Sequence, residues 1–169
     1  LEILNYFIMW LLVIQVIVFL SYVVGIVSRY GVLESISDSW YSLPLKYNGL
    51  FTLFTWGLGI PMLMYGSVAL FLSGAGLCFV GAATRFKLGY GYTTLVHFSG
   101  AVAGVLIPLL YFGFSYGIWW PFLLQFSGST FIFAYDRIRN PIWWVEILGF
   151  ITVLSGLYLI LPELNYVGN

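Results

Sequence analysis

The chain has 169 residues, of which 62% are apolar and only 7% are charged, and its mean hydropathy is +1.00. A water-soluble domain carries roughly a quarter charged residues, so this composition excludes an ordinary soluble protein. The net charge is zero, with six basic and six acidic residues, and the sequence contains no basic stripe of the kind that nucleic-acid binding requires. We therefore expect an all-α protein that lies in a lipid bilayer and has no nucleic-acid partner.

Long uncharged stretches follow one another, each long enough to cross a hydrocarbon core of about 30 Å. A transmembrane barrel would alternate polar and apolar residues, whereas these stretches are apolar all round. The uncharged stretch 49–84 would measure about 54 Å as one helix, so it predicts two spans with a turn near residues 65–67. The sequence predicts a single transmembrane helical bundle over 1–169, with six spans at about 3–27, 49–66, 68–84, 93–112, 118–135 and 142–161.

The basic residues indicate how this bundle lies in the membrane. With six spans, all of them fall in the connections after spans one, three and five, and they are Arg29, Lys46, Arg85, Lys87, Arg137 and Arg139. Short loops rich in Lys and Arg stay in the cytoplasm. We therefore predict that loops 28–48, 85–92 and 136–141 are cytoplasmic and that both termini lie outside, with a bacterial inner membrane as the favoured location. Trp40, Tyr41, Trp143 and Trp144 would then form an aromatic belt at the inner interface.

The segment "TTLVHFSGAVAG", residues 93–104, contains the only histidine of the chain, His97. Gly100 and Gly104 fall on the same helical face as His97 and form a GxxxG pattern, which lets a neighbouring backbone approach closely. We therefore expect the two glycines to serve helix packing and His97 to point at protein rather than at lipid.

Glu146 is the other ionisable residue well inside a predicted span. It is expected at a depth similar to that of His97, on the side where the first loop brings Ser35, Ser37 and Asp38. A charged side chain deep in a bilayer costs about 2.5–3.5 kcal/mol on insertion scales, so it requires a partner. Asp38, His97 and Glu146 are therefore the candidate catalytic residues, and His97 is the candidate metal ligand.

Each of these residues also has a purely structural interpretation, which the sequence leaves open. His97 would then donate to a neighbouring carbonyl and fix the packing of its helix. Glu146 would reach the interface between Trp143 and Trp144, or pair with Arg137 or Arg139. The serine-rich run would cap an interfacial helix.

The serine-rich loop, the span "SGAGLCFVGAATRF" and the histidine in "TTLVHFSGA" together resemble uncharacterised six- to seven-span membrane proteins of bacteria and their phages. That group is distantly similar to the superfamily of ceramidases and progestin/adiponectin receptors, which are intramembrane metal hydrolases. The resemblance covers about residues 33–105. It implies a zinc ion held by three histidines, with His97 as the first of them, Asp38 as the acid and Ser35 or Ser37 as the serine.

The chain departs from this superfamily in its last span, where the HxxxH pair is absent. One histidine with carboxylates is a poor zinc site, because such a site normally has three protein ligands. The favoured interpretation is therefore a non-enzymatic membrane protein, an inactive or repurposed relative, which acts through self-association or as a subunit of a larger assembly. We expect no cofactor, but a bound lipid. The alternatives are an intramembrane lipid-modifying hydrolase with its site at the cytoplasmic end, and a component of a proton or ion pathway.

Overall fold

The computed structural model of the protein describes residues 2–85 and 90–164, and throughout these residues the regular structure is helical. Six long helices follow the chain: α1 (Glu2–Tyr30), α3 (Gly49–Leu63), α4 (Val68–Arg85), α5 (Tyr90–Tyr116), α6 (Trp120–Ala134) and α7 (Pro141–Leu164). The connection between α1 and α3 contains a single helical turn, α2 (Ser39–Ser42), and a short 3-10 turn, η1 (Leu45–Tyr47). The prediction of an all-α fold is confirmed.

Each predicted span falls on one long helix, but the helices differ in length. Within the described residues, three of them are long and apolar enough to cross a membrane: Tyr6–Tyr30, Phe98–Tyr116 and Pro141–Leu164. The helices α3 and α4 are apolar but shorter, and a helix of 15 residues such as α3 or α6 measures only about 22 Å. Helix length and composition therefore support three crossings and not the predicted count of six.

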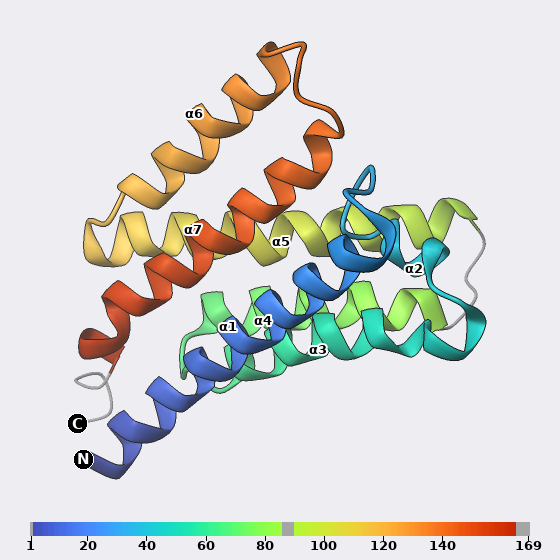
Figure 1. Ribbon diagram of the computed structural model, residues 1–169. Coiled ribbons are helices and arrows are strands. Elements are labelled where there is room, and N and C mark those ends of the chain that lie inside the picture. The colour runs from blue at the N-terminus through green and yellow to red at the C-terminus, as the bar shows by residue number, and fades with distance from the viewer. Residues whose placement is uncertain (1, 86–89, 165–169) are drawn as a thin grey trace.

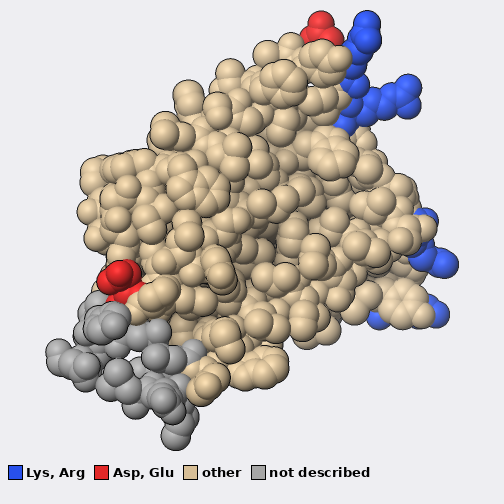
Figure 2. Space-filling view, turned by 60° about the vertical axis from the view of Figure 1, so that its left-hand side comes forward, with Lys and Arg blue, Asp and Glu red and all other residues tan. Residues whose placement is uncertain are grey.

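The long helices run alternately up and down, so the connections gather at two ends (Figure 1). Glu2 and Leu164, the first and last described residues, lie toward one end. At the opposite end, α1, α4 and α6 finish and α3, α5 and α7 begin, and we call this the cationic end. Arg29, Lys46, Arg137 and Arg139 lie in or next to its connections, and Figure 2 shows the basic side chains gathered on that side. Lys87 lies outside the described residues.

The helices α3, α4 and α5 pack side by side through glycines. A Cβ atom on Gly74 of α4 would lie 2.5 Å from the carbonyl oxygen of Gly59 in α3, and one on Gly100 of α5 would lie 2.6 Å from the carbonyl oxygen of Gly76 in α4. Gly104 faces the side chain of Leu77, also in α4. The GxxxG face of α5 is therefore occupied by a neighbouring helix of the same chain.

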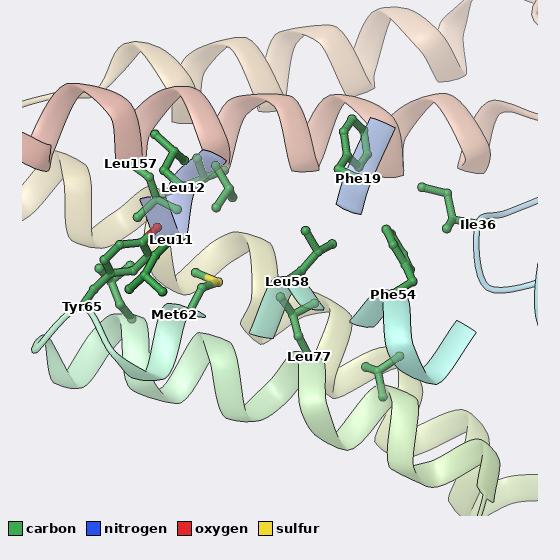
Figure 3. Close-up of a cluster of buried hydrophobic side chains, with 14 of the residues drawn as sticks. Leu11, Leu12, Phe19, Ile36, Phe54, Leu58, Met62, Tyr65, Leu77 and Leu157 are labelled. Carbon is green, nitrogen blue, oxygen red and sulfur yellow. The ribbon is translucent and has the colours of Figure 1, made fainter. Parts of the chain in front are cut away.

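The core lies where α1 and α7 cross this layer of three helices. Phe150 of α7 packs between Phe19 of α1 and Phe54 of α3, with ring centroids 5.4 and 5.7 Å apart. Figure 3 shows Ile36, from the loop that follows α1, at the side of this cluster near Phe54. The loop thus contributes to the core, and its neighbouring residues are held close to α7.

The face of the bundle in Figure 2 carries no charged side chains between its two ends, and many large apolar side chains are exposed on the long helices. Leu53 of α3, Phe79 of α4 and Phe126 of α6 are between 64 and 68% exposed. Soluble proteins rarely expose apolar surface on this scale. This surface fits a protein that is surrounded by lipid.

The close contact of α3 with α4 predicts that Gly74→Ala lowers the free energy of unfolding by about 1–3 kcal/mol, because the added methyl group meets a backbone carbonyl that cannot turn away. Gly25→Ala is the matched control, since a Cβ there meets no atom within 4 Å. Thermal unfolding in detergent, followed by circular dichroism, measures both. Equal melting temperatures for the two variants would contradict the packing.

Candidate functional site

Three hydrogen bonds fasten the loop after α1 to the beginning of α7. The side chain of Asn140 donates to the carbonyl oxygen of Val32 at 2.8 Å, and the backbone amide of Trp143 donates to that of Glu34 at 3.1 Å. The backbone amide of Ile36 donates to the Glu146 carboxylate. Segment 32–36 is therefore held along the first two turns of α7.

The partner of Glu146 is thus a backbone amide and not an arginine or an interfacial tryptophan. A carboxylate that accepts an amide hydrogen forms a charge-assisted bond, which is stronger than one between neutral groups.

Trp143 is 1% exposed, so its placement in an interfacial belt is wrong: its position on α7 turns it into the core. Trp144 is 42% exposed and keeps a position at the surface.

The serines of the loop hold the loop itself together. Ser35 Oγ accepts the backbone amide hydrogen of Asp38 at 3.1 Å and lies 2.8 Å from Ser37 Oγ. Ser39 Oγ donates to the carbonyl oxygen of Ile36 and also lies within hydrogen-bond distance of the Tyr22 hydroxyl. The serines therefore hold the loop together, but Asp38, the N-cap residue of α2, makes no side-chain capping bond to this helix.

A groove of about 820 Å³ runs between α5, α6 and α7, and the loop closes its end at the cationic end of the bundle. We call it the acidic groove. It exists because α5 and α6 touch each other much less than α4 and α5 do. Its polar end is lined by Glu34, Ser35, Ser37, Asp38 and Glu146, and its apolar walls include Val102, Leu106, Leu109, Phe122, Phe126 and Phe133.

Gln125 lies in the wall of the acidic groove and ties α6 to α7. Its amide nitrogen donates to Ser129 Oγ at 3.1 Å and to the carbonyl oxygen of Val145 at 3.3 Å, and its amide oxygen accepts from Thr152 Oγ1 at 3.3 Å. Sequence reasoning did not select this residue. The sequence did contain a signal for it, because Gln125 is the only glutamine in the predicted apolar span 118–135.

Gln15 forms a second buried polar cluster, toward the other end of the bundle, and it was also missed. Its amide nitrogen donates to the carbonyl oxygen of Leu58 at 2.7 Å, and its amide oxygen accepts from the Tyr65 hydroxyl at 2.7 Å. Burial raises the pKa of Tyr65, so its hydroxyl stays protonated and keeps donating. This cluster joins α1 to Leu58 of α3 and to Tyr65 in the turn between α3 and α4.

The structure brings Asp38 and Glu146 to the same end of one groove, as the sequence predicted for the two carboxylates. His97 belongs to α5, but its side chain lies outside the described part. Ala101, one turn further along α5, lines the acidic groove. Among the described side chains, no three histidine, cysteine, aspartate or glutamate residues are grouped so that they could hold a metal ion. The chain has a single histidine, so its donors do not fit the three-histidine zinc site that the family resemblance implies.

No family model, curated protein or solved structure matches the chain.

The bond to the Ile36 amide predicts that Glu146→Ala speeds hydrogen exchange at residues 35–39 by about tenfold or more, since a hydrogen bond to a charged group contributes roughly 1.5–3 kcal/mol. Glu146→Gln keeps an acceptor oxygen and should have a smaller effect. Glu163→Ala removes an exposed carboxylate at the far end of α7 and serves as the control. Exchange by mass spectrometry on the detergent-solubilised protein measures this, and an unchanged loop in Glu146→Ala would disprove the anchoring role.

Proposed function

We propose that this protein is a six-span integral membrane protein that binds an amphiphilic lipid in the acidic groove and does not change it chemically. The groove is the observation that carries this proposal: one end is lined by carboxylates and serines, and apart from Gln125 and Ser129 the rest is apolar. Its volume lies in the range of about 300–1,000 Å³ that is typical of ligand sites.

The proposal of six spans rests on the surfaces of the three shorter helices. Leu53, Phe79 and Phe126 on α3, α4 and α6 are exposed apolar residues, and water would be a poor solvent for them. Short spans are accommodated by local thinning of the bilayer, at a cost of fractions of a kcal/mol per Å. With the positive-inside rule, the cationic end then faces the cytoplasm and both termini lie outside, in a bacterial inner membrane.

The chemistry of the groove favours a headgroup that donates hydrogen bonds. Glu34 and Asp38 add two carboxylates to that of Glu146, which already accepts the amide hydrogen of Ile36. Such a site attracts ammonium and hydroxyl groups and repels phosphate and carboxylate groups. The apolar walls along α5 and α6 match the hydrocarbon chain of the same molecule.

A lipid-modifying hydrolase is a second candidate for the same groove. The convergence of Ser35, Ser37 and Asp38 at its polar end favours this function, in line with the family resemblance. The donor set does not fit zinc, so no metal-dependent step follows from it. Association with copies of the chain or with other membrane subunits stays part of the proposal, but Gly100 and Gly104 face α4, and a partner would have to contact other faces.

Filling the groove tests the binding function. Val102 is 40% exposed and lines the acidic groove, so Val102→Trp should block the groove without disturbing the core. We expect it to lower the affinity for octadecylamine by about tenfold or more in native mass spectrometry, with octadecanoic acid binding weakly to either form. Leu20→Trp, at an exposed position on α1, is the matched control.

Equal octadecylamine binding by Val102→Trp and the unmodified protein would contradict the proposal. Release of a cleaved product from the endogenous lipids, abolished in Asp38→Asn, would instead favour the hydrolase.

A further inference from the structure

A second groove lies on a different face of α7 and shares no lining residue with the acidic groove. It has a volume of about 960 Å³ and extends from the turn between α6 and α7 along the outer side of α7. We call it the arginine groove. At the turn between α6 and α7 its edge is formed by Arg137, Arg139 and Asn140. Its apolar wall is formed by Trp144, Ile147 and Ile151 of α7.

We propose that the arginine groove binds an anionic phospholipid, whose phosphate lies against Arg137 and Arg139 and whose acyl chain lies along α7. This site is separate from the amphiphile site of the acidic groove. It prefers an anionic headgroup, whereas the acidic groove prefers a cationic one.

The two guanidinium groups are presented by a turn of defined shape. The backbone amide of Ile138 donates to the carbonyl oxygen of Tyr135 at 3.0 Å. Asn140 has a φ of 56°, a conformation that asparagine tolerates better than most residues, and Pro141 follows as the first residue of α7, where its fixed φ is favourable. Because the Asn140 side chain is also bonded to the carbonyl oxygen of Val32, the turn is anchored at the groove.

The charges of this turn match a phosphate group. Arg137 and Arg139 are both exposed, and Asp136 is the one acidic residue of the turn, which leaves a net positive charge. A guanidinium group binds phosphate oxygens through two parallel hydrogen bonds. Basic pockets between membrane helices at the cytoplasmic side are known to bind anionic headgroups in this way.

The rest of the arginine groove matches the other parts of a phospholipid. Trp144 is 42% exposed in the first turn of α7, which suits an indole ring at headgroup depth. Ile147 and Ile151 follow one and two turns further along the same side of the helix. Along the groove the arginines, the indole ring and the aliphatic side chains therefore follow in the same order as the phosphate, the glycerol and the acyl chain of a phospholipid.

Titration of the full chain in detergent with phosphatidylglycerol, followed by native mass spectrometry, tests the site. Arg137→Gln combined with Arg139→Gln should weaken binding on the order of 30-fold, whereas phosphatidylcholine should bind weakly to both forms. Arg29→Gln combined with Lys46→Gln is the charge-matched control, because it removes two cations from the same end of the bundle outside the arginine groove. We expect it to change binding by less than about threefold.

Equal losses in the two double variants would mean that the cationic end attracts anionic lipid without a specific site, and the proposal would be overturned.

A second readout is independent of charge: Ile151→Trp fills the groove and should lower phosphatidylglycerol binding, with Leu20→Trp as control. Quenching of the protein's fluorescence by brominated phosphatidylglycerol should also fall when Trp144 is replaced by phenylalanine. An unchanged affinity in Ile151→Trp would likewise contradict the site, while octadecylamine binding in the acidic groove should persist in all these variants.

Discussion

The contact of backbones at glycines holds α3, α4 and α5 in one layer, and the rest of the bundle depends on it. Gly59 with Gly74, and Gly76 with Gly100, bring neighbouring helices closer than any larger residue would allow. Close approach of this kind drives association in lipid, where apolar burial between helices gives little gain. Because α5 is committed to α4 in this way, it contacts α6 only slightly, and the acidic groove opens between them.

The second constraint is the attachment of the loop after α1 to α7. A loop that carries free backbone groups must find hydrogen-bond partners when it is placed against helices. Here the partners are Asn140, the amide of Trp143 and the Glu146 carboxylate. The same contacts bring Asp38 and two serines to the end of the groove and fix the turn that presents Arg137 and Arg139. One set of bonds therefore positions the polar ends of both grooves.

The positions of the long helices followed from the sequence, because uncharged stretches separated by charged loops are a strong signal. The sequence predicted a reversal near residues 65–67, because a continuous helix over the uncharged stretch would be far longer than the membrane is thick. In the structure the reversal lies between Leu63 and Val68. The partner of Glu146 could not be predicted, because the amide of Ile36 has no side-chain signature and lies 110 residues away in the sequence. The burial of Trp143 depends on which face of α7 meets the core, and composition alone does not specify that face.

The central proposal is that all six long helices lie within the bilayer, including the three whose length and composition do not require it. Spin labels at Leu53, Phe79 and Phe126, each introduced as a single cysteine in a Cys78→Ala background and reconstituted in nanodiscs, test this most directly. For a six-span bundle we expect all three labels to relax strongly with molecular oxygen, which concentrates in lipid, and weakly with a water-soluble nickel complex. A label on α3, α4 or α6 that responds mainly to the nickel complex would show that helix to lie in water and would contradict the six-span bundle.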